Sequence, residues 1–225
     1  MAAAKSNTNW FAIGVSAAVV VVLVALGGLV VFLNNQATAP GVAPQSAIVD
    51  DKTGAITFGG GEDSIDTYVD FMCPVCGQFE DAYGEQLQTA AADDKITLNI
   101  HPISILDFQS QNSKYSTRAA NSMYCVAAEA PDSALDYFNS LFANQPQEGT
   151  AGLTDEQLGD LATQAGAEAA VSCITDGTYS KFVADQTKNT PPDPDTGRVG
   201  TPTVVINGDR INNADIQAEF SKILG

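Results

Sequence analysis

The sequence Ile65-Asp66-Thr67-Tyr68-Val69-Asp70-Phe71 leads through Met72 into Cys73-Pro74-Val75-Cys76. The first part is apolar and predicts a strand, and a helix is expected to follow the cysteines. Cys73 would then lie at a helix N-terminus, where unpaired backbone N–H groups and the helix dipole favour an anion. A thiolate is stabilised there, its pKa falls, and it becomes a good nucleophile and a good leaving group. The pattern of strand, CxxC and helix is therefore typical of a dithiol–disulfide exchange site.

The residues around this motif predict a βαβ unit. Apolar residues recur at near-helical spacing from Val75 to Leu87, which indicates one apolar helix face that ends near residues 92–94. Residues 95–103 alternate apolar and polar side chains, which predicts a second strand. A strand, a helix and a strand in this order form a parallel pair joined by a right-handed crossover. We also expect a short strand before the unit, over residues 55–58.

The second half of the chain predicts a helical segment, a hairpin and a last helix. Proline and glycine punctuate residues 113–188, where helices are expected at 116–129, 133–144, 154–165, 168–175 and 178–187. A proline-rich surface loop follows at residues 189–198. Gly200-Thr201-Pro202-Thr203 then leads a β-branched run that ends in Asn207-Gly208, a hairpin turn signal. Residues 215–224 predict an amphipathic helix.

An uncharged, mostly apolar run covers residues 10–33. As a helix it would be about 36 Å long, enough to cross a bilayer core of about 30 Å. A cleavable signal peptide has an apolar region of only about 7–15 residues, so we expect an uncleaved transmembrane signal anchor. The alternative is cleavage after Ala37-Thr38-Ala39, which imitates a cleavage site but is followed directly by Pro40.

The distribution of positive charge predicts the orientation of this anchor. Lys5 and the amino terminus precede the run, and the next basic residue is Lys52. The positive-inside rule therefore places the short N-terminus, residues 1–9, in the cytoplasm and exports everything after the run. Residues 34–47 contain two prolines and few large apolar side chains, so we expect a linker there and the folded domain at 48–225. We thus expect a single-pass protein of the plasma membrane with an extracytoplasmic domain.

The composition excludes one class of partner and favours cysteine pairing. The chain carries a formal net charge of −17 and has no basic patch, so nucleic acid is not expected as a partner. Its four cysteines are Cys73, Cys76, Cys125 and Cys173. In an exported domain an even number favours pairs, so Cys125 and Cys173 are candidates for a structural disulfide. The alternative is that these two are buried free thiols.

The order of these elements resembles the thioredoxin fold of the DsbA family. The resemblance rests on a βαβ unit with CPxC, a helical insertion at about residues 113–188, and Thr201-Pro202 before a strand, a hairpin and a final helix. It covers residues 48–225 and implies an α/β thioredoxin fold, preceded here by one N-terminal transmembrane helix. The acidic, anchored form with two extra cysteines is similar to the DsbA-like proteins of Gram-positive actinobacteria. Cys125 and Cys173 match the extra cysteine pair of those relatives.

The resemblance also implies roles for the site residues. Pro202 would be a cis proline that exposes the backbone of Thr201 beside Cys73, where a substrate strand can hydrogen-bond. The alternative is an ordinary trans proline at the start of a strand. A substrate thiolate would attack Cys73, the exposed cysteine of a Cys73–Cys76 disulfide, with Cys76 as the resolving partner. Pro74 and Val75 complete the active-site motif. The result would be a thiol:disulfide oxidoreductase that donates its disulfide to exported proteins.

The same resemblance implies the partners. The substrates would be reduced exported proteins, and a membrane quinone-coupled enzyme of the DsbB or VKOR type would reoxidise the dithiol. The anchor at residues 10–33 would keep both enzymes in one membrane and raise their effective concentration. Neither a metal ion nor an organic cofactor is expected.

Three positions differ from patterns in better-known relatives. Val75 stands where the best-known members have histidine, so it offers no positive charge or hydrogen bond to the thiolate. Thr67 stands six residues before the first cysteine, where many thioredoxin-fold enzymes have a buried acid. Asp66 and Asp70 flank it, but strand alternation is expected to send both to the other face. Thr201 before the proline is typical of isomerase-type relatives.

Two alternatives to a thiol oxidase stay open. One is a disulfide reductase or isomerase on the same fold, which the redox potential of the Cys73–Cys76 pair would distinguish. The other is a non-catalytic binding module such as a metal site, although zinc sites normally use paired ligands and Cys125 and Cys173 lie far apart in the sequence. His101, the single histidine, is expected to be structural.

Overall fold

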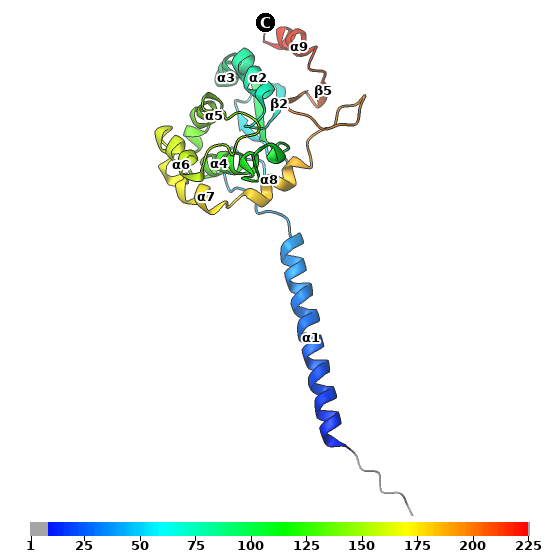
Figure 1. Ribbon diagram of the computed structural model, residues 1–225. Coiled ribbons are helices and arrows are strands. Elements are labelled where there is room, and N and C mark those ends of the chain that lie inside the picture. Colours follow the sequence, from blue (N-terminus) through cyan, green and yellow to red (C-terminus); the bar gives the residue numbers. More distant parts are fainter. Residues whose placement is uncertain (1–8, 225) are drawn as a thin grey trace, which may run out of the picture. The chain divides into compact units, whose positions relative to one another are not determined.

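The computed structural model describes residues 9–224, which fall into two compact units, one up to Pro40 and one from Gly41 onward (Figure 1). The expected cytoplasmic N-terminus at residues 1–9 lies outside the described residues except for Asn9, and so does Gly225.

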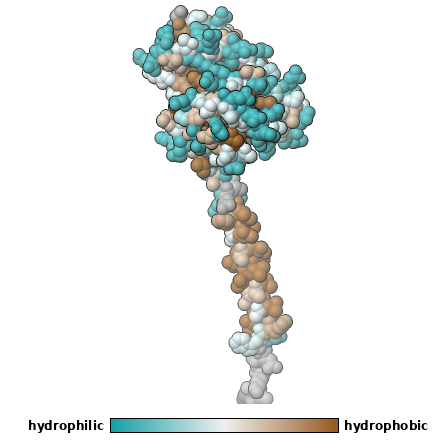
Figure 2. Space-filling model, turned by 90° about the vertical axis from the view of Figure 1, so that its left-hand side faces the viewer, coloured by the Kyte–Doolittle hydropathy of each residue, from teal (hydrophilic) through white to brown (hydrophobic). Residues whose placement is uncertain are grey.

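The first unit is the helix α1 (Trp10–Thr38). Its stretch Ile13–Asn35 is long and apolar enough to cross a membrane, and Figure 2 shows a mainly hydrophobic surface along it. The helix continues past Leu33, where we expected the apolar run to end. Residues 34–38 contain neither proline nor glycine, and the helix ends only where Pro40 disfavours helical geometry for the residue before it.

The rest of the expected linker belongs to the folded unit. The backbone N–H of Gly41 donates to Asp185 Oδ2 at 2.9 Å, and Ser46 Oγ donates to the carbonyl oxygen of Ala127 at 2.6 Å. The folded unit therefore begins at Gly41 instead of Ile48, and the expected linker is shortened from both sides. The small residues and prolines of the segment predicted a flexible linker. Its hydrogen bonds to distant parts of the chain hold it in place instead, and composition does not reveal such bonds.

The described part of the folded unit contains one five-stranded sheet. Its strands are β1 (Ile56–Phe58), β2 (Asp63–Val69), β3 (Ile96–Pro102), β4 (Thr203–Ile206) and β5 (Asp209–Ile211). Their order in the sheet is β1-β3-β2-β4-β5. β2 and β3 are parallel, and the other neighbouring pairs are antiparallel. The expected parallel pair and C-terminal hairpin are thus confirmed.

Helices connect and cover these strands. Between β2 and β3 lie α2 (Pro74–Phe79), the π-helical turn η1 (Glu80–Gly84) and α3 (Glu85–Ala92). The expected helical insertion between β3 and β4 is confirmed. It consists of η2 (Asp107–Gln109), α4 (Tyr115–Glu129), η3 (Pro131–Ser133), α5 (Ala134–Ala143), α6 (Asp155–Gln164), η4 (Glu168–Ala170), α7 (Val171–Asp176) and α8 (Ser180–Thr187). The helix α9 (Ile216–Ile223) follows β5.

Aromatic contacts hold the segment that carries the CxxC motif. Phe71, just after β2, packs against Phe138 and Phe142 of α5, with ring centroids 5.9 and 5.1 Å away. Phe79 of α2 packs against Phe220 of α9, with centroids 6.2 Å apart. The segment from β2 to α2 is therefore held by both the insertion and the last helix, and such aromatic pairs stabilise a fold beyond their buried area.

Candidate active site

Cys73 lies at the N-terminus of α2. It is the N-cap residue in an extended conformation, and Pro74 follows in the first helical turn, where a missing N–H costs no hydrogen bond. The carbonyl oxygen of Cys73 accepts the backbone N–H of Cys76 at 3.0 Å and that of Gly77 at 3.2 Å. The Cys73 thiol therefore belongs to the N-cap residue of α2, and the N-terminus of a helix favours an anion.

Both cysteines of the motif are free thiols and both are buried. Cys73 is 4% exposed and Cys76 is 0% exposed. We expected Cys73 to be the exposed cysteine, and it is the more accessible of the two, although only slightly. The physical reason is the loop of Thr201, whose carbonyl oxygen lies 3.4 Å from Cys73 Sγ. A substrate sulfur has to approach beside this loop.

The two thiols have opposite electrostatic surroundings. The pKa of Cys73 is lowered to about 7, first because the Cys76 thiol donates a hydrogen bond to it, and also because the backbone N–H groups of Cys76 and Val75 point to it. Burial opposes this shift. The pKa of Cys76 is raised well above its ordinary value, mainly by burial and then by the neighbouring Cys73 sulfur. Near neutral pH Cys73 is therefore partly ionised, while Cys76 keeps its proton.

The loop before β4 meets both sulfurs. The Thr201–Pro202 peptide bond is cis. The thiol of Cys73 donates to the Thr201 carbonyl oxygen at 3.4 Å, while Thr201 Oγ1 lies 2.9 Å from Cys76 Sγ and 3.2 Å from the carbonyl oxygen of Tyr68, to which it donates. The structure thus brings together the four residues that the sequence placed in one site.

A buried acid lies near the motif at a position that strand alternation did not predict. β2 ends at Val69, so Asp70 is in the following turn and the alternation does not apply to it. Asp70 is fully buried; its Oδ1 accepts the N–H of Met72 at 2.9 Å and its Oδ2 accepts the N–H of Leu106 at 2.8 Å. Burial raises the pKa of Asp70 to about 6, and its charge raises the pKa of Cys73. The carboxylate of Asp70 therefore binds the backbone of Met72 and Leu106, and it acts on Cys73 through its charge.

The neighbouring polar residues of β2 do follow the strand pattern. Thr67 is buried, and its hydroxyl has no hydrogen-bond partner within the described part of the chain. Asp66 binds His101 instead, with Oδ1 2.8 Å from Nε2, and the His101 ring stacks on Tyr68 with centroids 4.1 Å apart. His101 is therefore part of the sheet, as expected, and contacts none of the site residues named above.

Two further side chains support the site and were not singled out from the sequence. Gln145, after α5, donates to the carbonyl oxygen of Cys73 at 2.9 Å. Arg210 of β5 donates to Asp193 Oδ2 at 2.7 Å and to Thr203 Oγ1 at 3.4 Å, which ties the proline-rich loop to the residue after Pro202. Neither lies near the cysteines in sequence, so no local motif could have indicated them.

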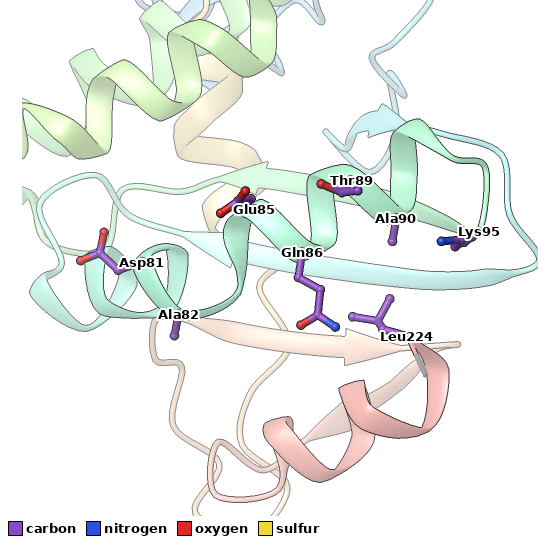
Figure 3. A pocket seen from close by; sticks show the side chains of 8 residues that line it. All are labelled: Asp81, Ala82, Glu85, Gln86, Thr89, Ala90, Lys95 and Leu224. Carbon is purple, nitrogen blue, oxygen red and sulfur yellow. The ribbon is translucent and has the colours of Figure 1, made fainter.

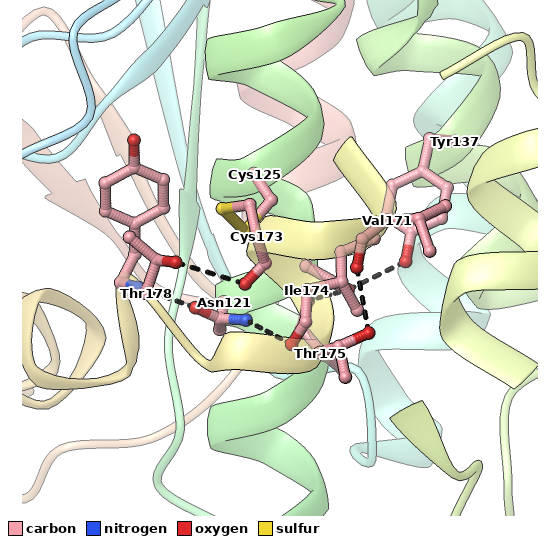
Figure 4. The surroundings of a disulfide bond; sticks show 11 residues. Asn121, Cys125, Tyr137, Val171, Cys173, Ile174, Thr175 and Thr178 are labelled. Atoms are coloured by element: carbon pink, nitrogen blue, oxygen red, sulfur yellow. Dashed lines mark hydrogen bonds between the residues drawn. A yellow bond between two sulfur atoms is a disulfide. The ribbon is translucent and has the colours of Figure 1, made fainter. Parts of the chain in front are cut away.

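The other two cysteines form a disulfide between α4 and α7 (Figure 4). Cys125 is fully buried on α4, and Cys173 lies on α7. Asn121, one turn before Cys125, donates to the carbonyl oxygen of Ile174 at 3.4 Å and accepts the N–H of Tyr179 at 2.7 Å. Figure 4 shows this side chain beside the disulfide. The bond therefore joins two helices of the insertion and lies apart from the CxxC motif in the sequence.

A surface pocket of about 370 Å³ lies elsewhere, between α3 and the chain end after α9 (Figure 3). Its lining residues are Asp81, Ala82, Glu85, Gln86, Thr89, Ala90, Lys95 and Leu224. In Figure 3 most of these side chains come from η1 and α3, and Leu224 at the end of α9 lies near Gln86 of α3. The pocket includes neither cysteine, and no chemistry is assigned to it.

Comparison with known proteins relates the chain to several thiol-disulfide enzymes. Oxidised DsbA of Mycobacterium tuberculosis is 26% identical, with a TM-score of 0.63, over 76% of this chain and 93% of that chain. The reduced disulfide bond oxidoreductase DsbG of Mycobacterium tuberculosis is also 26% identical, with a TM-score of 0.62, over 82% of this chain and 86% of that chain. MdbA of Corynebacterium diphtheriae, a thiol-disulfide oxidoreductase, has a TM-score of 0.66 over 84% of this chain and 98% of that chain. At 21% sequence identity this similarity shows the fold.

A curated relative and a family model complete the comparison. Serine/threonine-protein kinase PknE of Mycobacterium tuberculosis is 40% identical over 119 residues, which are 51% of this chain but 21% of the kinase, so the chain spans only a small part of that relative. The family model described as thioredoxin matches residues 60–225, which contain both cysteines of the motif and the cis proline. The chain therefore belongs to the thioredoxin family, and within it to the DsbA-like thiol–disulfide oxidoreductases.

Proposed function

We propose that this chain is an extracytoplasmic thiol oxidase that donates the Cys73–Cys76 disulfide to exported proteins. The observation that carries the proposal is the asymmetry of the pair: the pKa of Cys73 is lowered to about 7 while that of Cys76 is raised. A thiolate stabilised in the dithiol form makes reduction of the disulfide more favourable, which is the property of a disulfide donor.

The exchange would proceed in two steps. A substrate thiolate attacks Cys73 Sγ, the bond between Cys73 and Cys76 breaks, and the Cys76 thiolate takes up a proton because burial raises its pKa. A second substrate thiolate then attacks the substrate sulfur of the mixed disulfide, and Cys73 leaves as a thiolate. Two electrons pass from the substrate dithiol to the cysteine pair, and the substrate gains one disulfide.

The cis-proline loop would hold the substrate during this exchange. Its backbone at Thr201 lies beside Cys73, and an extended substrate peptide would bind there by main-chain hydrogen bonds. The Thr201 hydroxyl, 2.9 Å from Cys76 Sγ, would stay with the resolving cysteine while Cys73 is bonded to the substrate. Thr201 and Pro202 would therefore orient the substrate and the pair, and the two cysteines would carry the chemistry.

The apolar helix supports a membrane-bound location. We propose that α1 is an uncleaved anchor, with residues 1–9 in the cytoplasm and the folded unit outside the plasma membrane. A membrane quinone reductase of the DsbB or VKOR type would then reoxidise the dithiol, and a shared membrane would raise the rate of their encounter.

A reductase or isomerase is the second candidate, and Val75 favours it. Its side chain is half exposed and offers neither charge nor hydrogen bond to the Cys73 thiolate. The lowered pKa of Cys73 then depends on the hydrogen bond from the Cys76 thiol and on the backbone N–H groups of Cys76 and Val75.

The direction of exchange can be tested by mixing one equivalent of oxidised full-length chain, in detergent, with a reduced unfolded protein. We expect substrate thiols to disappear as Cys73 and Cys76 become reduced. Cys73→Ser should abolish the exchange. When the reduced Cys76→Ser variant is mixed with a substrate that carries a disulfide, the Cys73 thiolate should attack that disulfide, release one substrate thiolate and accumulate as a mixed disulfide, because no second cysteine resolves it. Faster reduction of an oxidised substrate by the dithiol form would instead favour the reductase. A mixed disulfide formed through Cys76 in the Cys73→Ser variant would contradict the assigned roles.

A further inference from the structure

The helical insertion sends one polar side chain to the backbone of the CxxC motif. Gln145 lies two residues after the end of α5, and Pro146 follows it, so the helix cannot continue. Its Nε2 donates to the carbonyl oxygen of Cys73 at 2.9 Å and to that of Phe71 at 3.2 Å. The partners are more than seventy positions earlier in the chain, so these bonds connect the insertion with the first half of the thioredoxin unit.

The residue after the motif leaves room for this amide. Gly77 is helical, and a Cβ atom added to it would lie 2.5 Å from Gln145 Oε1. Glycine inside a helix is unfavourable compared with alanine, so its presence there requires another reason. The close approach of the Gln145 amide supplies that reason, and the two residues form a matched pair.

The carbonyl group that Gln145 binds determines where the Cys73 thiolate lies. This oxygen already accepts the N–H groups of Cys76 and Gly77, and the amide of Gln145 is its third donor. Fixing the carbonyl fixes the peptide plane that follows Cys73, and with it the direction of the first turn of α2. The backbone N–H groups of Val75 and Cys76, which lower the pKa of Cys73, belong to this turn.

We propose that Gln145 is a positioning residue for thiol–disulfide exchange. Its amide holds the main chain of Cys73 so that, once the disulfide is broken, the thiolate stays within reach of the N–H groups of the first turn. The dithiol form is thereby favoured, and the disulfide becomes a better donor. This inference rests on the proposed function, and it assigns to the insertion a direct effect on the redox property of the motif.

The test compares Gln145→Ala with Gln147→Ala, which removes an exposed glutamine from the same loop. Two quantities are measured on the full-length chain: the pKa of Cys73 from thiolate absorbance, and the equilibrium constant with glutathione. A neutral hydrogen bond contributes about 1 kcal/mol, so Gln145→Ala should shift the equilibrium about three- to tenfold toward the disulfide and raise the pKa of Cys73. Gln147→Ala should leave both unchanged.

A second pair of variants keeps the inference testable if Gln145→Ala folds poorly. Gln145→Glu keeps the size of the side chain but removes the donor, and it should shift both quantities in the same direction as Gln145→Ala. Gly77→Ala pushes against the end of a flexible side chain, so it should displace the amide and also raise the pKa of Cys73. In a Gln145→Ala background Gly77→Ala should have little effect on the pKa of Cys73, because the amide that it would displace is already absent. This double-mutant cycle measures the coupling between the two residues.

A merely structural role would give another pattern. Gln145→Ala would then lower the free energy of unfolding equally in the disulfide and dithiol forms and leave the pKa of Cys73 and the equilibrium constant at their original values. That result would overturn the inference while the wild-type chain still donates its disulfide. Failure of the wild-type chain to exchange disulfides would instead refute the proposed function itself.

Discussion

At the residue scale, Asp70 is the acid that influences Cys73. Its carboxylate is fully buried, and its negative charge raises the pKa of Cys73. We predict that Asp70→Asn lowers the pKa of Cys73, because the repulsion between the two negative charges disappears. Titration of thiolate absorbance in the dithiol form measures this shift. An unchanged or raised pKa of Cys73 in a folded Asp70→Asn variant would show that the hydrogen bonds of Asp70 matter more than its charge.

The same residue predicts a pH dependence of stability. Burial raises the pKa of Asp70 from 3.8 to about 6, so the folded state binds a proton more tightly than the unfolded state. The stability from this proton is fully present below about pH 4 and is lost as the pH rises through about 6. By linkage, the wild-type chain should lose up to about 3 kcal/mol relative to Asp70→Asn across this window.

Denaturant unfolding of the disulfide form between pH 4 and pH 8 measures this difference, because the disulfide removes the titration of Cys73 and Cys76. Asp66→Asn is the control, since Asp66 lies four residues earlier, on β2, and binds His101 instead. A constant difference between wild type and Asp70→Asn over the whole range would contradict the assignment.

At the element scale, the disulfide joins α4 and α7 across a sequence separation of 48. In the chain-entropy model, closing such a loop stabilises the fold by about 4 kcal/mol, and engineered disulfides often stabilise a fold by less than the model predicts. We therefore predict that Cys125→Ala with Cys173→Ala lowers the free energy of unfolding by about 2–4 kcal/mol. Disulfide exchange by the folded variant should be retained, because the bond lies within the insertion. Loss of exchange with unchanged stability would show that this pair takes part in the redox reaction.

The elements show which parts of the fold a sequence can predict. Periodicity predicted the parallel pair, the helical insertion and the hairpin, because these patterns are local and strong. Two features have physical causes outside the pattern: Asp70 lies beyond the end of β2, where alternation no longer applies, and Gly41 is held by the distant Asp185. The contact of Gln145 with Cys73 depends on tertiary structure alone, although Gly77 after the motif was a visible sign that something approaches closely.

At the scale of the whole molecule, the chain combines an apolar helix with a strongly acidic remainder. The formal net charge is −17, and the single helix able to cross a membrane among the described residues is consistent with a membrane anchor or a signal sequence. We predict that the chain stays in the membrane fraction after alkaline carbonate washing and is released by detergent. N-terminal sequencing should find the residues before Trp10 intact. A chain that begins near Pro40 would show that the helix is a cleaved signal sequence.

The reduction potential of the Cys73–Cys76 pair decides whether its disulfide is a donor. The full-length chain in detergent is equilibrated with glutathione buffers of known ratio, and the fraction of disulfide is measured, with Cys73→Ser as the control. We expect a potential above about −200 mV, on the oxidising side of the known range. A potential near or below about −250 mV would contradict it, since the dithiol would then favour the reduction of other proteins.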